Sequence, residues 1–378
     1  MSATPTTPQR LLSIDLLRGL TVMLMIMVNA GIGDVFPCFA HAYWTGFTLA
    51  DCVMPSFLFI MGASTYLSLR KYGFHWSHAA AAKIVRRTLI LFLLGLFVNW
   101  LGPALDGRPL DFAHLRIWGV MQRIAICYCL TAIVALSARR ALVSIIIAGL
   151  IVYGVLIKVC GGYSEDLSQN FLAYFDFLLL GKDHLMLYPF EPEGFFSNLS
   201  AVLTSMIGFY TMEKLTQIQD LKRKLLFLTI SGVALAVIGL ILTPFFPLSK
   251  KIWSPSFVLL NAGIAQIVLC ALMALVDRRK NGSELHQKEN NPHNKEKHHL
   301  GITTLLQAFG MNPLLLYVGS EVLIIAFWSF GIAGQSYERL LALVGNGHWA
   351  SLIYMVLVTA IFGIIGLVLH HKRIFVKI

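Results

Sequence analysis

The sequence predicts an all-α fold, a polytopic membrane helix bundle of about ten transmembrane helices. Hydrophobic residues make up 57% of the 378 residues and charged residues only 13%, with a mean hydropathy of +0.72. These values lie outside the range of soluble globular domains. Apolar stretches also follow one another with short polar connections, and each approaches the roughly 20 residues that a membrane-spanning helix needs. We therefore treat residues 1–378 as a single transmembrane domain.

Ten stretches are apolar enough to span a membrane. The ninth is too long for one straight helix, so we expect its first part, Leu305 to Met311, to lie partly at the membrane interface. In chain order, the expected spans are Leu11 to Ile32, Leu49 to Leu69, Ile84 to Leu101, Ile117 to Ser137, Ala141 to Cys160, Gly194 to Thr211, Leu225 to Phe245, Trp253 to Val276, Thr303 to Phe330 and Trp349 to His370.

The positions of the basic residues predict the orientation of the bundle. Cytoplasmic loops of membrane proteins carry an excess of Lys and Arg, and most of the 30 such residues here fall in alternate connections. With the N-terminus inside, both termini are cytoplasmic. The net charge of +11 then needs no nucleic acid as a partner, because basic inner loops meet anionic lipid head groups.

Two segments lie outside the expected spans at the cytoplasmic side. Residues 1–10 form an N-terminal tail, and residues 277–300 are polar and charged, which predicts a flexible cytoplasmic loop. No cleavable signal is expected, because the first apolar run carries Asp15 and Arg18. The six cysteines show no metal-ligand spacing, so no metal is expected.

Polar residues at membrane depth are the informative ones, because a charge there costs at least ~2.5 kcal/mol unless it finds a partner or water. The first two spans and their connection concentrate five of them. The candidates there are Asp15, Arg18, Asn29, His41 and Asp51.

The predicted topology puts these five residues at two levels. Asp15 and Arg18 lie near the cytoplasmic face, and the other three lie near the outer face. An arginine holds phosphates well, and a histidine with a nearby carboxylate serves as a base whose tautomer that carboxylate fixes. The alternative is that Asp15 and Arg18, three residues apart on a helix, only neutralise each other, and that His41 is a solvated loop residue.

Six sequence blocks carry a resemblance to a known family. In chain order they are RLLSIDLLRGLTVMLMIMVNAG, HAYWTGFTLADCVMPSFLFIMGAS, GVMQRIAICY, EPEGFFSNLSAV, FPLSKKIWSPSFVLL and GMNPLLLYVGSEV. Together they resemble the transmembrane heparan-α-glucosaminide N-acetyltransferase family from about Arg10 to Glu321. Because the resemblance starts at the catalytic core, we expect a bacterial-type member without the luminal N-terminal domain of the animal enzymes, in the inner (cytoplasmic) membrane.

The resemblance implies a reaction and a donor. Acetyl-CoA would enter from the cytoplasm, and an amino sugar of the glucosaminide type would be acetylated on the far side. His41, in H-A-x-W-x-G, matches the catalytic histidine of the family, and Asn29 matches the asparagine of its V-N motif. Arg18, in D-x-x-R-G with Asp15, and Arg123, in G-V-x-Q-R, are expected to contact acetyl-CoA.

This chemistry needs these residue types. A protonated amine does not attack a thioester, so a base must take a proton, and imidazole has an ordinary pKa of about 6.5. His41 is that candidate, and Asp51 would orient its ring. Asn29 is the nearest amide donor for the developing negative charge, a role worth roughly 3 kcal/mol. Transfer is either direct or through an acetylated His41.

Three further residues are substrate-binding candidates, each with an alternative role. Trp44 either stacks on a sugar ring or sits in the aromatic belt of the membrane. Glu193 either binds the acceptor or caps its helix, and Glu321 either serves the site or bonds two helices together. The expected partners are an amino-sugar or glycan acceptor, membrane lipids and, from the resemblance, a homodimer.

Two other functions remain open at this stage. One is an O-acetyltransferase that modifies hydroxyl groups of a surface glycan. The other is a transporter of a small solute whose buried charges line the substrate path, although the sequence shows no inverted repeat strong enough to suggest one.

Overall fold

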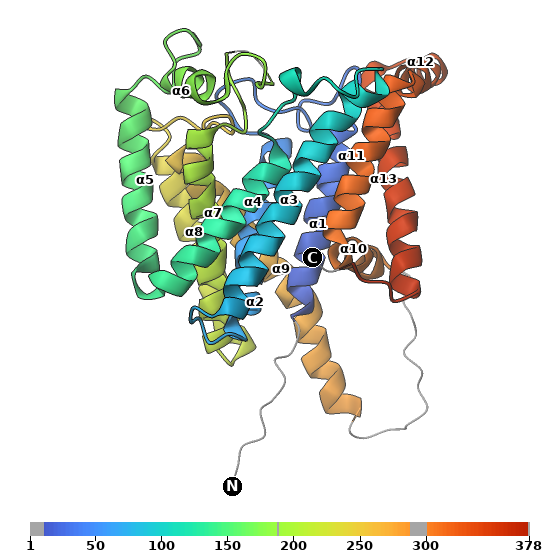
Figure 1. Cartoon of the computed structure of the whole chain (residues 1–378). Coiled ribbons are helices and arrows are strands. Elements are labelled where there is room, and N and C mark those ends of the chain that lie inside the picture. Colours follow the sequence, from blue (N-terminus) through green and yellow to red (C-terminus); the bar gives the residue numbers. More distant parts are fainter. Residues whose placement is uncertain (1–10, 187–188, 288–300, 377–378) are drawn as a thin grey trace.

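A computed structural model of the protein describes residues 11–186, 189–287 and 301–376. Within those ranges the chain forms helices and no β-strand, so the predicted all-α bundle is confirmed (Figure 1). The α-helices are α1 (Leu12–Asn29), α2 (Leu49–Arg70), α3 (His78–Leu105), α4 (Val120–Ser137), α5 (Leu142–Val159), α6 (Phe171–Leu180), α7 (Phe195–Gln217), α8 (Leu221–Ile241), α9 (Pro255–Gln287), α10 (Ile302–Met311), α11 (Pro313–Ser329), α12 (Ile332–Val344) and α13 (Gly347–His371).

Each of the ten expected spans coincides with a helix or with a pair of helices. In the described part of the chain, eight helices are long and apolar enough to cross a membrane, and the pair α10 and α11 adds a ninth. These two helices are bent by 86° at a break around Asn312, where Pro313 begins α11. The expectation that the ninth stretch is not one straight helix is therefore confirmed.

The one expected span that these nine leave out is Gly194 to Thr211, which forms α7. This helix is long enough to span a membrane but is less apolar than the others. Its 23 residues include many Ser and Thr side chains, and most of its residues are buried among neighbouring helices. A helix enclosed by protein does not need a lipid-compatible surface all round, which explains why α7 falls below the hydropathy of the other spans.

The structure corrects one expected boundary and adds two helices. Residues 277–287, expected as part of a loop, continue α9 to Gln287, because a helix already formed propagates readily through Arg, Lys, Glu and Gln. The rest of that loop, 288–300, and the tail 1–10 lie outside the described residues. The added helices α6 and α12 lie in connections and are too short to span.

Two crossings at the centre of the bundle depend on glycine. α2 packs along α7 at Gly62 and Gly208, and α1 packs on α10 at Gly19 and Gly310. A Cβ atom at any of these positions would meet the backbone of the facing helix. Small residues allow membrane helices to approach this closely. These contacts hold α2 against α7 and α1 against α10.

The bundle has two distinct ends (Figure 1). At one end, α1 begins, α2 ends at Arg70, and α10 lies across the bundle. We call this the basic end. We call the opposite end, where α6, α12 and the long loops lie, the loop end. Residues 38–50 and 246–254 belong to the loop end, and both contribute to the site described next.

Candidate active site

Asp51 is held by the local structure at the start of α2. Thr48 caps the helix, and the Thr48 backbone N–H and hydroxyl donate to Asp51 Oδ2 at 3.1 Å and 3.0 Å. This is the reciprocal bonding of a capping box, which a Thr followed three residues later by an acid encodes. The Ala42 N–H adds a third bond to Oδ2 at 3.2 Å. Asp51 Oδ2 is therefore saturated, while Oδ1 points elsewhere.

His41 forms a hydrogen bond with the other oxygen of Asp51. Its Nδ1 lies 2.9 Å from Asp51 Oδ1, and the side chain of Asp51 is 0% exposed while that of His41 is 44% exposed. A carboxylate accepts but does not donate, so Nδ1 carries the proton and Nε2 keeps its lone pair. His41 is thus held in the tautomer that a base requires.

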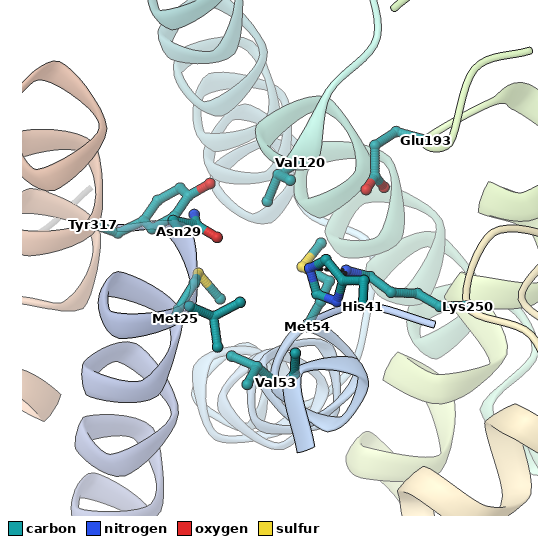
Figure 2. A pocket seen from close by; sticks show the side chains of 11 residues that line it. Met25, Asn29, His41, Val53, Met54, Val120, Glu193, Lys250 and Tyr317 are labelled. Atoms are coloured by element: carbon teal, nitrogen blue, oxygen red, sulfur yellow. Dashed lines mark hydrogen bonds between the residues drawn. The ribbon is translucent and has the colours of Figure 1, made fainter. Parts of the chain in front are cut away.

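A small pocket opens in front of His41 at the loop end (Figure 2). We call it the His41 pocket; it has a volume of about 40 Å³. His41 and Lys250 lie on one side, Asn29 and Tyr317 lie across from them, and the carboxylate of Glu193 points in from a third direction. The helices α1, α2, α4 and α11 form its walls, with apolar side chains such as Met54 between the polar ones. This space fits a group as small as an acetyl or an amine.

Asn29 is fixed by a bond between two helices. Its Nδ2 donates to Glu321 Oε1 of α11 at 2.5 Å. An amide nitrogen has two N–H donors, so the bond to Glu321 holds the side chain in place and uses one of the two. Tyr317, on the same helix as Glu321, lies against Asn29 (Figure 2).

Glu193 is held by Arg123, and both are buried. Arg123 Nε forms an ion pair with Glu193 Oε2 at 2.7 Å. The same guanidinium donates to Asn198 and Ser197 of α7 and stacks on the ring of Trp253 at 4.5 Å. A buried charge needs such partners, and they aim the Glu193 carboxylate at the His41 pocket.

A larger cavity lies toward the basic end. We call it the basic cavity; its volume is about 390 Å³, within the usual size of ligand sites. Arg18, Lys83 and Arg87 line it, and Tyr317 and Leu314 of α11 form part of its wall. Three cations around one cavity suit an anion that carries several negative charges, such as a phosphorylated ligand.

The cations of the basic cavity are held by polar contacts. Arg18 donates to Asp15 Oδ1 at 2.9 Å and to Ser64 Oγ at 2.8 Å. Lys83 donates to Ser68 Oγ at 2.6 Å, and Arg87 stacks on the Tyr128 ring at 4.5 Å. Lys83 and Arg87 have uncharged partners here, Ser68 and Tyr128, whereas the charge of Arg18 is paired with Asp15. Three cations against this one carboxylate leave the cavity electropositive.

Tyr317 lines both cavities. They are built from the same helices, since α1 contributes Asn29 to one and Arg18 to the other, and α2 and α11 also reach both. Arg18 therefore lines one cavity and His41 lines the other.

The structure separates some of the candidates from these cavities. Arg123 lies with Glu193 at the loop end and is not among the residues that line the basic cavity with Arg18. Asp15 pairs with Arg18 without lining the cavity. Trp44 is buried, donates from its indole to Tyr163 O and packs on Phe190, so it does not line the His41 pocket.

Glu321 reaches Asn29 and so bonds two helices together, which was one of its two predicted roles. In the described part of the chain, no group of three or more His, Cys, Asp or Glu side chains is placed to hold a metal ion.

Sequence reasoning missed Lys250, Tyr317, Lys83 and Arg87. The distribution of basic residues places Lys83 and Arg87 in a connection on the cytoplasmic side and Lys250 in one on the opposite side, and it gives none of them a role in a site. Lys250 Nζ lies 3.0 Å from His41 Nε2, although the two residues are 209 positions apart in the sequence. The turn that carries it is tied to the His41 loop by a bond from the Gly46 N–H to Leu248 O at 2.8 Å. No spacing rule brings two such loops together.

Comparison with known proteins connects this geometry to a family. Residues 10–198 match the family model described as heparan-alpha-glucosaminide N-acetyltransferase, catalytic, which is half of the chain. The human heparan-alpha-glucosaminide N-acetyltransferase is 26% identical to the chain, and the mouse protein of the same name is also 26% identical. Each match covers 98% of this chain and 60% of the relative, so the chain spans about 60% of the length of these relatives.

Proposed function

Because the chain belongs to the heparan-α-glucosaminide N-acetyltransferase family, we propose that it transfers an acetyl group from acetyl-CoA to the amine of an amino sugar. The observation that carries this proposal is the pair of cavities that share Tyr317, one lined by three cations and the other by His41. A donor with phosphates at one end and a thioester at the other suits such a pair.

The basic cavity is the proposed donor site. Arg18, Lys83 and Arg87 would hold the phosphates of acetyl-CoA, because guanidinium and ammonium groups donate strong charge-assisted bonds to phosphate oxygens. The apolar wall that Ile60 and Leu314 provide suits the uncharged arm of the donor. The thioester supplies an activated acetyl group, and Tyr317, which lines both cavities, would lie beside the donor arm that reaches the His41 pocket.

His41 is the proposed general base. Asp51 holds the proton on Nδ1, so the lone pair of Nε2 faces the pocket and takes a proton from an acceptor amine that replaces Lys250 there. As His41 gains that proton, the buried carboxylate of Asp51 stabilises the resulting imidazolium. The remaining N–H of Asn29, across the pocket, is the proposed donor to the negative charge that develops on the acetyl oxygen.

Glu193 is the proposed contact for the acceptor. Its carboxylate points into the His41 pocket and accepts from an ammonium or hydroxyl group of a sugar. Arg123 would serve this contact by holding Glu193 in place, rather than by binding the donor as the sequence suggested. A polar sugar is thereby drawn to the loop end of the bundle.

The proposal also has a sidedness. We propose that the basic end faces the cytoplasm in the inner membrane, so that the donor enters from the cytoplasm and the acceptor binds from the other side. The excess of basic residues in the connections at the basic end supports this orientation. A homodimer and lipid partners stay predictions.

The test is acetyl transfer by purified protein in liposomes. Labelled acetyl-CoA is supplied with glucosamine-type acceptors, and labelled N-acetyl product is expected. His41→Ala should abolish it, because the base is lost. His114→Ala is the matched control: His114 also bonds an aspartate, Asp111 at 2.6 Å, but lies exposed and outside the pocket.

The same experiment separates the alternatives. Label that is released by mild base would show an ester, and hence an O-acetyltransferase. Movement of an intact solute across the membrane without consumption of acetyl-CoA would show a transporter. Full turnover of His41→Ala with a competent acceptor would refute the proposed mechanism.

A further inference from the structure

Lys250 places a primary amine directly against the proposed base. Its Nζ lies 3.0 Å from His41 Nε2 and 3.4 Å from Nδ1. Since Asp51 holds the proton on Nδ1, the close contact at Nε2 is one in which Lys250 donates and His41 accepts. Figure 2 shows the lysine side chain running along the edge of the pocket to the imidazole.

A base that deprotonates an amine must lie within about 2.6–3.2 Å of the amine nitrogen. The Lys250 nitrogen meets this condition with no further movement. It therefore occupies the position that the acceptor amine must take during transfer. Because the Nε2 atom of a neutral imidazole has a single lone pair, it accepts from one amine at a time.

The surroundings of Lys250 also favour an uncharged amine. Burial lowers the pKa of Lys250, and Arg123 lowers it further, while Glu193 and Asp51 act in the opposite direction. Burial likewise lowers the pKa of the next residue, Lys251. The two lysines differ in placement, because the Lys251 ammonium lies over the rings of Tyr43 and Trp44, away from His41.

We propose that Lys250 occupies the acceptor-amine position of the resting enzyme and is itself acetylated on Nζ when the donor is bound without an acceptor. This inference rests on the proposed function, because it needs the donor thioester in the His41 pocket. It assigns a modification site to a residue that serves no other step of the mechanism.

The acetylation of Lys250 needs only the donor thioester, the lysine amine and His41. The lone pair of the neutral Lys250 nitrogen attacks the carbonyl carbon of the acetyl thioester and forms a C–N bond. His41 Nε2 takes a proton from that nitrogen. The C–S bond breaks, and the leaving thiolate receives the proton from His41, which returns to its starting state. The products are Nε-acetyllysine and free CoA.

The modification has a functional consequence. Acetyl-Lys250 carries the same amide linkage as an N-acetylated sugar, so it fills the His41 pocket with an internal product. An acetylated enzyme no longer admits an acceptor amine to Nε2. Acetyl-CoA alone is therefore expected to inactivate the protein gradually, while an acceptor that displaces Lys250 protects it.

The experiment follows the label rather than turnover. Purified wild-type protein in liposomes is incubated with labelled acetyl-CoA, with and without glucosamine, and the acetylated positions are identified by peptide mass spectrometry. Without acceptor, acetylation of Lys250 should exceed that of Lys251 by ~10²-fold or more, because only Lys250 has a general base. Glucosamine should reduce it, and His41→Ala should bring it down to the level of Lys251, whereas His114→Ala should leave it unchanged.

The outcomes distinguish this inference from the proposed function. Labelled sugar with Lys250 acetylated no more than Lys251 overturns the inference and leaves the proposed function standing. Lys250 labelling that depends on His41, in a protein that acetylates no amino sugar, supports the inference and contradicts the proposed acceptor. Lys250 labelling that persists in His41→Ala overturns the role assigned here to His41.

Discussion

Replacing Asp51 with asparagine is expected to reverse the tautomer of His41. Asp51 Oδ2 accepts from the Ala42 N–H and from the N–H and hydroxyl of Thr48, at 3.0–3.2 Å. An amide NH₂ in that place would face donors and leave buried groups unpaired, at a cost of ~1–3 kcal/mol each. The asparagine oxygen therefore takes the Oδ2 position, and its NH₂ faces His41 Nδ1.

The consequence falls on the base. With an N–H donor opposite it, Nδ1 must accept, so the proton moves to Nε2 and the lone pair that faces the pocket is lost. General-base catalysis contributes ~10²–10⁴-fold to a rate, and Asp51→Asn should lower kcat by about that factor. KM for acetyl-CoA should stay close to its original value, because Asp51 does not line the basic cavity.

The assay is labelled acetyl transfer in liposomes over a range of acetyl-CoA concentrations. Asp34→Asn is the matched control, since Asp34 is an exposed acid in the loop that follows α1 and does not line the His41 pocket. Its kcat should equal that of the wild type. If Asp51→Asn also kept the wild-type kcat while folded, the tautomer argument would be refuted.

Three further predictions address the donor site, the helix packing and pH. Arg87→Ala should raise KM for acetyl-CoA by about 10- to 100-fold, as expected for the loss of a charged hydrogen bond of ~1.5–3 kcal/mol. Arg86 is exposed and does not line the basic cavity, so Arg86→Ala should leave KM unchanged. Gly62→Ala should destabilise the protein by ~1–3 kcal/mol in a thermal melt, because the added methyl group meets the backbone of α7, whereas Gly334→Ala, with open space around its Cβ position, should not lower Tm. Burial raises the pKa of Asp176 from 3.8 to about 7, so the native state binds the proton more tightly, and the stability of the protein falls as pH rises between these two values. Asp176→Asn should therefore raise Tm above pH ~7 and leave Tm nearly unchanged below pH ~4. An equal gain in Tm at both pH values would contradict burial as the cause.

Much of the fold follows from local patterns in the sequence. The spans are apolar runs of the required length, and the break at Pro313 is visible in a stretch too long for one helix. The position of Asp51 is also local, because Thr48 and Asp51 form a capping box within one turn. Such features depend on neighbours in the chain, which a single sequence displays directly.

The remaining features depend on tertiary structure. Lys250 meets His41 because a bond from Gly46 to Leu248 ties two distant loops together. Arg123 belongs to a motif that suggested donor binding, but it lies in the first turn of α4, at the loop end, and pairs there with Glu193. The sequence does not predict that α9 continues to Gln287, because this polar segment includes the weak helix formers Asn281 and Gly282. The helix continues because extending a formed helix costs much less than nucleating one.

A structure of the protein with a non-reactive acetyl-CoA analogue, in which a methylene group replaces the sulfur, tests the central claim most directly. The account predicts the phosphates against Arg18, Lys83 and Arg87, and the acetyl carbonyl beyond Tyr317 in the His41 pocket. An analogue bound with its acetyl end away from His41, or with its phosphates outside the basic cavity, would contradict the account.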